Sequence, residues 1–324
     1  MNVYAEKLVP IIKDQMVAVE ESLLKKVESQ VKIVNNIGVH LTKAGGKRLR
    51  PALYLLCSYD AKLPLKENAS LAASLELIHM ATLVHDDVID EASTRRGQPT
   101  ANALWDNKIS VLAGDYLLAM AFSSIADFIK PREIEVMANT IASVCEGEIL
   151  QNINAFNADI SMEDYKKKTF QKTANFIASS CELGAMRANF TEEQISKFQT
   201  YGNCLGMAFQ ITDDILDITG DTKHIGKPAG NDLKQGIITL PVIYALKNSP
   251  HKEELRILVS SAEITDEQVD KALEITKECG AVEYSYDIVR DYLQDAKNIL
   301  PKELSLEVKN SLINVIDFVE SRDY

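Results

Sequence analysis

Helical spacing of apolar residues with few interruptions most constrains the fold of this chain. Only 14 glycines and 9 prolines occur among its 324 residues, so residues that break helices are scarce. Apolar positions recur at helical spacing over 1–40, 101–129, 132–157, 162–189, 192–218 and again from 240 to the end. No strand-like alternation bounded by turns stands out. The pattern predicts an all-α fold with a single domain, residues 1–324, of roughly ten or more helices.

The segment 68–90 is apolar on two faces. One stripe contains Leu71, Leu75 and Ile78, and another contains Leu77, Ala81, Val84 and Val88. A helix with apolar stripes on two faces is buried nearly all round. We therefore expect this segment to lie in the core.

Composition excludes several classes of protein. The net charge of −12 argues against nucleic-acid binding, which needs a basic surface. The five cysteines are widely spread and form no close pair typical of a zinc site, which favours a reducing compartment. The N-terminus carries charges within each apolar stretch, unlike a signal peptide, and no long uncharged apolar run predicts a transmembrane segment. The expected location is the cytoplasm.

Two clusters share the pattern D-D-x-x-D, DDVID at 86–90 and DDILD at 213–217. On a helix the first and last aspartates share a face and the second lies about 100° round. Each cluster is predicted in the last turns of its helix, where the helix dipole disfavours carboxylates. Mutual repulsion of three acids adds to this cost. A solvated acidic helix end would explain one such cluster, but two copies indicate a hard divalent cation such as Mg²⁺.

Cationic residues lie near both clusters in the sequence. GGKRLRP at 45–51 places Lys47, Arg48 and Arg50 after two glycines, an arrangement that suits a phosphate. The other candidates are Arg95 and Arg96, which follow the first cluster, Lys172 between Phe170 and Phe176, Lys227 and Lys234 in the irregular segment 219–236, and His79. A surface role is the ordinary explanation for any one of these, and a lone buried histidine is usually a core residue. Their combination favours a diphosphate site.

Five segments together resemble the trans-isoprenyl diphosphate synthase family, in order and spacing. They are GGKRLRP, HMATLVHDDVIDEASTRRGQPT, FQKTANF, GMAFQITDDILD and GKPAGNDLKQGIITLP. The resemblance covers roughly residues 30–245 and implies a helical bundle around a central cavity. It is greatest to members that make a heptaprenyl chain for menaquinone as a heterodimer with a small non-catalytic subunit. It implies condensation of isopentenyl diphosphate with an allylic diphosphate, farnesyl diphosphate being the expected starter.

The resemblance also implies roles for matched residues. Three Mg²⁺ ions would be held by Asp86, Asp87, Asp90, Asp213, Asp214 and Asp217. Isopentenyl diphosphate would be bound by Lys47, Arg50, His79 and Arg96. The allylic diphosphate would contact Arg95, Lys172, Lys227 and Lys234, with Thr173 and Gln210 at the reacting centre. The first triad, Lys172, Thr173 and Gln210 form the expected catalytic set.

The chemistry is consistent with these residue types. Ionising an allylic diphosphate creates a carbocation and a highly charged leaving group, which metal and basic residues stabilise. Oxygens of Thr173 and Gln210 are suited to stabilising the cation. Water would quench it, so the segment 219–236 is a candidate lid.

The length of the product is expected to depend on the buried helix before Asp86. Ala81 and Thr82 are small and leave room for a growing chain, with Ile78 and Ser74 further back. At about 1.5 Å per residue the helix from 68 to 86 runs roughly 27 Å, enough for several isoprene units. We predict a medium-to-long product, although close helix packing alone also explains small residues.

Two other functions remain open from the sequence. A class I terpene cyclase shares the first acidic cluster and the metals, but does not need a second diphosphate site such as GGKRLRP. A non-catalytic helical partner subunit would carry acidic clusters without a role, and the set of basic residues argues against it.

Overall fold

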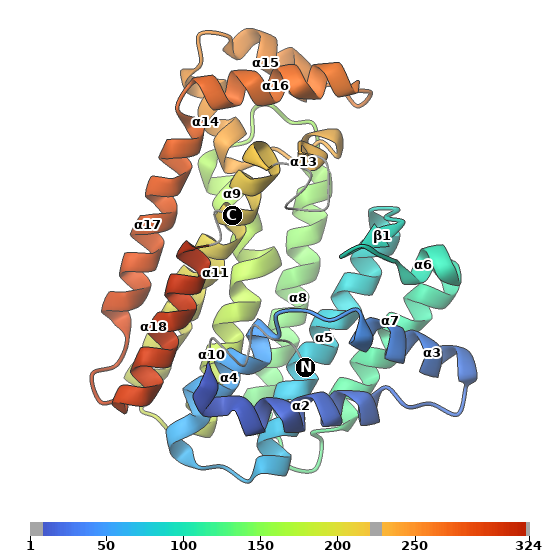
Figure 1. Cartoon of the computed structure of the whole chain (residues 1–324), viewed down its shortest axis with the longest axis vertical. Coiled ribbons are helices and arrows are strands. Elements are labelled where there is room, and N and C mark those ends of the chain that lie inside the picture. Colours follow the sequence, from blue (N-terminus) through green and yellow to red (C-terminus); the bar gives the residue numbers. More distant parts are fainter. Residues whose placement is uncertain (1–8, 221–228, 322–324) are drawn as a thin grey trace. The chain divides into compact units, whose positions relative to one another are not determined.

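The computed structural model describes residues 9–220 and 229–321. Helices dominate this part of the chain, which confirms the all-α prediction (Figure 1). Within the described ranges, the strands are limited to an antiparallel hairpin of β1 (Thr94–Arg95) and β2 (Gln98–Pro99). Lys227 and most of the candidate lid lie outside the described residues.

The chain divides into two compact units, which are described separately. Unit 1 comprises Met1–Met137, Ser180–Ser196 and Pro301–Val315, and unit 2 comprises Ala138–Ser179, Lys197–Leu300 and Ile316–Tyr324. Four helices contain a boundary between these ranges: α8 (Pro131–Ile153), α10 (Asn175–Arg187), α11 (Glu192–Thr219) and α18 (Leu306–Glu320). That the chain forms a single domain stays a prediction.

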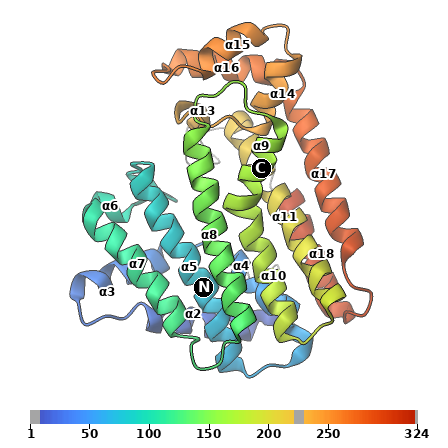
Figure 2. The same ribbon diagram turned by 180° about the vertical axis from the view of Figure 1, so that it is seen from behind.

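Unit 1 is built on α5 (Leu65–Ile89), which packs against α7 (Asn107–Ser123), α2 (Lys13–Lys26) and α4 (Leu49–Ser58) (Figure 2). Both predicted apolar stripes of α5 are largely buried, with Leu71, Leu77 and Ala81 all at 0% exposure. The helix is thus buried nearly all round, as expected. The remaining elements are η1 (Pro10–Ile12), α3 (Lys32–Lys43), η2 (Tyr59–Ala61) and α6 (Ala101–Leu104).

The expected helix over 101–129 is in fact two helices. Asp106 has a φ of 121° and its side chain accepts a hydrogen bond from the Ile109 amide, so it caps a new helix, α7. An aspartate at the N-cap satisfies an amide that the first turn leaves without a partner. The single-helix expectation was wrong because the apolar spacing continues across this break.

Unit 2 contains a π-helix, η3 (Phe170–Ala174), between α9 (Met162–Thr169) and α10. Two glycines let neighbouring helices approach it closely. A Cβ added to Gly147 of α8 would lie 2.6 Å from the Lys172 amide nitrogen, and one added to Gly206 of α11 would lie 2.5 Å from the Ala174 Cα. Short π-helical segments inside α-helices are frequent at functional sites.

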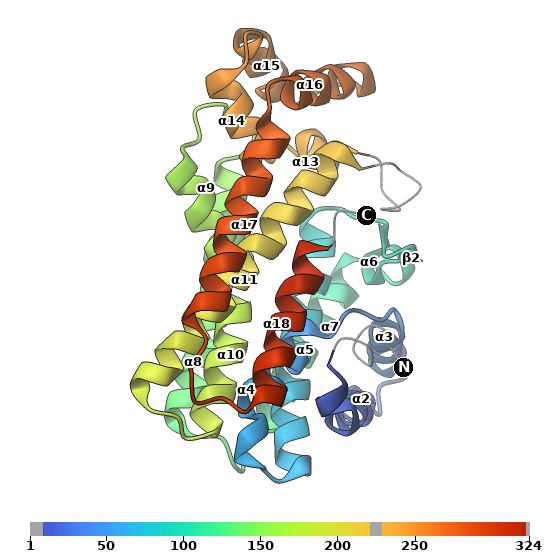
Figure 3. The same cartoon turned by 60° about the vertical axis from the view of Figure 1, so that its left-hand side comes forward.

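The rest of unit 2 consists of the short α13 (Asn231–Lys234) and four further helices. These are α14 (Leu240–Asn248), α15 (Lys252–Val259), α16 (Asp266–Glu278) and α17 (Ala281–Ile299), which pack on one another (Figure 3). None of the helices within the described residues has the length and apolar character needed to span a membrane.

Candidate active site

The first aspartate cluster occupies the last turn of α5, as predicted. Asp86 and Asp90 are half-buried, whereas Asp87 is only 3% exposed. The Arg95 Nε donates to Asp87 Oδ1 at 2.7 Å. The middle carboxylate therefore turns inward to an arginine of the β-hairpin, and the outer two share the other face of the helix.

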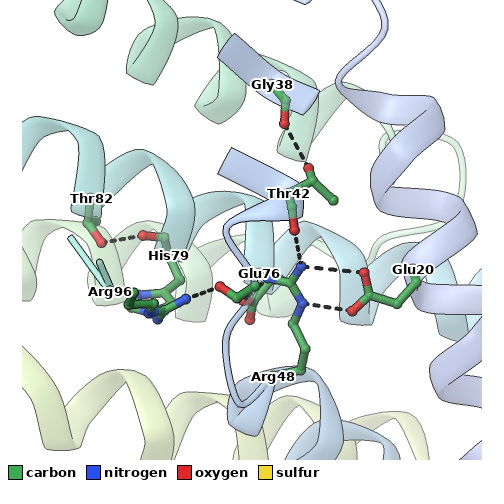
Figure 4. A network of polar contacts seen from close by, with 9 residues as sticks. Glu20, Gly38, Thr42, Arg48, Glu76, His79, Thr82 and Arg96 are labelled. Carbon is green, nitrogen blue, oxygen red and sulfur yellow. Dashed lines mark hydrogen bonds and ion pairs between the residues drawn. The ribbon is translucent and has the colours of Figure 1, made fainter. Parts of the chain in front are cut away.

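Arg48 anchors the turn that carries the predicted phosphate-binding residues (Figure 4). Its guanidinium donates to Glu20 Oε1 and Glu76 Oε1, each at 2.8 Å, and to the Thr42 carbonyl at 3.0 Å. Burial lowers the pKa of Arg48, but Glu76 and Glu20 outweigh it, and its pKa stays above the ordinary value. Arg48 is thus a structural cation, and it holds the backbone between Lys47 and Arg50 in place.

Arg96 closes the other side of this turn. It donates to the Gly45 carbonyl, and a Cβ on Gly46 would lie 2.6 Å from its guanidinium. Only a glycine at position 46 lets Arg96 come this close to the backbone. Lys47 therefore directly follows the two glycines that Arg96 touches, and Arg50 lies just beyond it in the first turn of α4.

A small pocket within unit 1, with a cavity volume of about 40 Å³, is lined in part by Arg96. Its polar lining includes Arg48, Arg95, Arg96, Glu76 and Asp87. Arginines outnumber carboxylates in this lining, and the guanidinium fork matches phosphate oxygens. The pocket is chemically suited to an anion.

Desolvation shapes the charge state of the same region. Burial lowers the pKa of Arg50 to about 10, so Arg50 remains a cation at neutral pH. Burial, reinforced by Arg50 and Arg96, holds the pKa of His79 well below its usual range. His79 is therefore a neutral imidazole, which adds a hydrogen-bonding group without adding charge.

The second cluster lies in the last turns of α11 and repeats the burial pattern of the first. Asp213 and Asp217 are half-buried, and Asp214 is 3% exposed. The Tyr165 hydroxyl donates to Asp214 Oδ2 at 2.6 Å, and the Gln210 amide donates to Oδ1 at 2.9 Å. Burial raises the pKa of Asp214, against the opposing effect of nearby Lys168.

Asp217 closes the start of α13. Its two carboxylate oxygens accept hydrogen bonds from the Asn231 and Asp232 amides, both at 3.2 Å. The last member of the second cluster thereby ties α11 to the chain that follows residue 228. This bond was not foreseen, because nothing in the sequence pairs residue 217 with residue 231.

The predicted residues of η3 meet partners within unit 2. The Lys172 Nζ lies 2.5 Å from Glu148 Oε2, and the Thr173 hydroxyl donates to Gln210 Oε1 at 2.8 Å. Thr173 and Gln210 are thus brought together, as expected for two groups at one reacting centre. Lys234 contacts Asp266 Oδ1 at 2.5 Å on the surface, and its contact with the allylic diphosphate stays a prediction.

The carboxylates of the two clusters suit Mg²⁺, which water and substrate help to coordinate, better than a cation that protein side chains coordinate alone. In the described ranges, no group of three acidic, histidine or cysteine side chains is arranged to hold a metal by itself. Asp87 and Asp214 are buried, whereas the outer aspartates of both clusters are half-buried and more accessible to an incoming ligand. Mg²⁺ is commonly bound by one or two carboxylates, waters and substrate phosphates, so two sparse carboxylate sites suit a metal that arrives with a diphosphate.

A family model described as polyprenyl synthetase matches residues 31–276. The chain belongs to this family. As a polyprenyl synthetase it is a trans-prenyltransferase that builds medium-to-long chains, and the predicted family and enzyme class are confirmed.

Curated relatives of this polyprenyl synthetase include two bacillary proteins. It is 39% identical over 313 residues to heptaprenyl diphosphate synthase component 2 of Geobacillus stearothermophilus, covering 97% of each chain. It is 38% identical over 316 residues to the protein of that name from Bacillus subtilis, covering 97% of this chain and 89% of the relative.

Solved structures resemble it over nearly their whole length. Heptaprenyl diphosphate synthase from Staphylococcus aureus matches with a TM-score of 0.90 and 31% identity, covering 97% of this chain and 99% of that one. A polyprenyl synthase from Caulobacter crescentus, complexed with calcium and isoprenyl diphosphate, matches with a TM-score of 0.93 and 33% identity, covering 99% and 98%.

Proposed function

We propose that this chain is a Mg²⁺-dependent heptaprenyl diphosphate synthase subunit. It extends farnesyl diphosphate by successive condensations with isopentenyl diphosphate and serves the menaquinone side chain. The family is Mg²⁺-dependent in general, and two of its relatives carry the heptaprenyl name. The five cysteines form no disulfide, in keeping with work in the cytoplasm.

The arginine-lined pocket beside the first cluster is the observation that carries the proposal. Arg95 ends β1 and Arg96 lies in the turn that follows, where it donates to the Gly45 carbonyl shortly before Lys47. Isopentenyl diphosphate is placed at Lys47, Arg50, His79 and Arg96, where a neutral imidazole completes a cationic site. A cyclase, which takes one diphosphate, has no use for this second anion site.

The outer aspartates of both clusters are proposed to bind the allylic diphosphate through Mg²⁺, with Arg95 and Lys172 as cationic contacts. Up to three bound Mg²⁺ ions supply charge neutralisation for the departing diphosphate. The six aspartates of the two clusters are the proposed ligands, and the half-buried outer ones are the more accessible to a metal that arrives with a diphosphate. The protein side chains orient the diphosphate and exclude water from the allylic cation.

Product length is assigned to the buried face of α5. Ala81, Ile78 and Ser74 are at most 1% exposed, and Thr82 is half-buried with its hydroxyl bonded to the His79 carbonyl at 2.9 Å. We expect Ala81→Phe to shorten the product, because the ring occupies the path of the growing chain. Thr82→Phe tests whether the growing chain passes instead along the adjacent side of α5, about 100° round the helix. Unchanged product lengths in both variants would contradict the assignment of product length to α5.

The partner is proposed to be a small non-catalytic subunit in a heterodimer. The name "component 2" of the two relatives implies another component. In unit 1, Val111 and Leu112 of α7 are 41% and 64% exposed, an apolar pair suited to a protein contact.

One assay tests the function. The chain is incubated with Mg²⁺, farnesyl diphosphate and labelled isopentenyl diphosphate, alone and with component 1 of the Bacillus subtilis enzyme, and product lengths are measured. A C35 product supports the proposal. Consumption of farnesyl diphosphate without isopentenyl diphosphate would indicate a cyclase, and a chain that adds nothing to a competent partner would be a non-catalytic subunit.

A further inference from the structure

A chain of hydrogen bonds in unit 2 leads from a buried tyrosine to the predicted reacting centre. Tyr165, on α9, is 0% exposed and donates its hydroxyl proton to Asp214 Oδ2 at 2.6 Å. Asp214 Oδ1 accepts from Gln210 Nε2 at 2.9 Å, and Gln210 Oε1 accepts from Thr173 Oγ1 at 2.8 Å. Four side chains from three elements are thereby linked, with donation converging on Asp214 from Tyr165 on one side and from Thr173 through Gln210 on the other.

The backbone is built for this linkage. Gly206, Gln210 and Asp214 are spaced four residues apart, so they share one face of α11. Gly206 allows the close approach to Ala174 of the π-helix, which puts Thr173 within reach of Gln210 one turn further on. Asp214, one more turn along, then meets Tyr165.

The direction of the bonds has a chemical consequence. A carboxylate only accepts hydrogen bonds, so Asp214 holds the NH₂ end of the Gln210 amide and turns its oxygen to Thr173. A hydroxyl has a single proton, and Thr173 gives it to Gln210. Only lone pairs of Thr173 Oγ1 remain for any other neighbour, so this oxygen can face a cation but cannot donate to it.

A buried cation balances the charge of the carboxylate. Lys168 is 7% exposed, and its Nζ lies 5.2 Å from the centre of the Tyr165 ring. Burial lowers the pKa of Lys168, while Asp214 and Asp232 favour its charged form.

We propose that Tyr165 is a positioning residue: by fixing Asp214 it sets the Gln210 amide, and so makes Thr173 an obligate acceptor toward the allylic cation. The inference rests on the proposed function. In the step concerned, the allylic C–O bond breaks, its electron pair leaves with the diphosphate, and the lone pairs of Thr173 stabilise the cationic carbon without forming a bond.

Tyr165→Phe removes the hydroxyl and little else. The lost bond is to a charged acceptor, for which about a tenfold effect is reasonable, so we expect kcat to fall about tenfold with the KM for farnesyl diphosphate within about twofold. Tyr201→Phe, at another buried tyrosine of unit 2, is the matched control and should leave both constants unchanged. Replacement of Tyr165 by 4-aminophenylalanine retains a donor and should restore part of kcat.

Inhibitor binding separates positioning from structural damage. The probes are an ammonium analogue of the allylic cation, bound with inorganic diphosphate, and an uncharged analogue of the same shape. Tyr165→Phe should weaken the ammonium analogue about tenfold and leave the neutral one unchanged. Equal weakening of both, or of neither, would overturn the proposal.

Two further variants close the test. If Thr173 is the endpoint, Tyr165→Phe added to Thr173→Val should cause no further loss, because the two share one pathway; additive losses contradict it. Should Tyr165→Phe not fold, Asp214→Asn takes its place, and an unchanged ratio of the two inhibitors there also overturns the proposal. If the wild-type chain with its partner fails to elongate, the proposed function fails; if only the variants behave as wild type, the positioning role alone fails.

Discussion

Asp87 in unit 1 and Asp214 in unit 2 are the second residues of the same pattern and are equally buried, at 3% exposure. Their partners differ in kind. Asp87 forms an ion pair with Arg95, whereas Asp214 is held by the neutral donors of Tyr165 and Gln210. The same five-residue pattern is thus stabilised once by a charge and once by a hydrogen-bond network.

The cations near the two clusters also differ in kind. In unit 1 the fixed cations near the cluster are arginines, anchored by Arg48 between two glutamates. In unit 2 the nearby cations are Lys168 and Lys172, and Lys172 rests on Glu148. Arginine forks favour a rigid diphosphate site, and lysines are compact charges on flexible stems. The two clusters therefore differ in the cations near them, which are guanidinium groups in unit 1 and ammonium groups in unit 2.

The largest expected effect on kcat comes from the outer aspartates, which have the same proposed role in both clusters. Asp86→Asn and Asp213→Asn should each lower kcat by about 10²–10³-fold, the scale for losing one group that stabilises charge in the transition state. The measurement is steady-state elongation at saturating Mg²⁺ and substrates. Asp270→Asn, at an exposed position of α16, should have no effect. Near wild-type kcat in either outer variant would contradict a metal role for that cluster.

A smaller effect tests the rigidity of the arginine site. Arg50→Lys keeps the charge but loses the planar fork, at the scale of one charge-assisted hydrogen bond. We expect the KM for isopentenyl diphosphate to rise about tenfold, with kcat and the KM for farnesyl diphosphate nearly unchanged. A rise in the KM for farnesyl diphosphate instead would show that the two anion sites were assigned the wrong way round.

The free energy of unfolding distinguishes the ion pair at Asp87 from the neutral hydrogen bonds at Asp214. Arg95→Gln removes the ion pair of the buried Asp87, and because Arg95 is about one-third exposed we expect a loss of about 1–2 kcal/mol rather than the larger cost of a fully buried pair. Urea unfolding measures it. Arg256→Gln, which breaks an exposed pair with Asp159, should leave the unfolding midpoint in place. An equally small shift for Arg95→Gln would show that the ion pair does not hold Asp87.

The sequence predicted the features that follow from periodicity and from covalent neighbourhood. Two apolar stripes identified α5 as a buried helix, and the apolar run upstream of each cluster placed the aspartates at helix ends. These predictions succeeded because helix geometry alone decides them.

Tertiary partners were out of reach of the same argument. Helix geometry placed Asp87 and Asp214 about 100° round the helix from the first aspartate of each cluster. It did not show that this side of the helix would be buried. Tyr165 sits among lysines in the sequence, and only the fold brings it to Asp214. Lys234 was chosen for its closeness in sequence to the second cluster, yet α13 directs it to Asp266.

The smallest expected effect is a pH dependence that belongs to the arginine-rich side. In the folded chain the pKa of His79 is held well below 6.5, first by burial and then by Arg50 and Arg96. The unfolded chain therefore binds a proton here as the pH falls below about 6.5, while the folded chain does not, so the free energy of unfolding decreases by up to about 1.4 kcal/mol per pH unit. His79→Gln should remove this slope between about pH 6.5 and 5, measured by urea unfolding, whereas above pH 7.5 the wild type and the variant should run parallel. Parallel curves below pH 6.5 as well would mean that His79 takes up its proton in the folded chain, and the neutral imidazole in the isopentenyl diphosphate site would have to be abandoned.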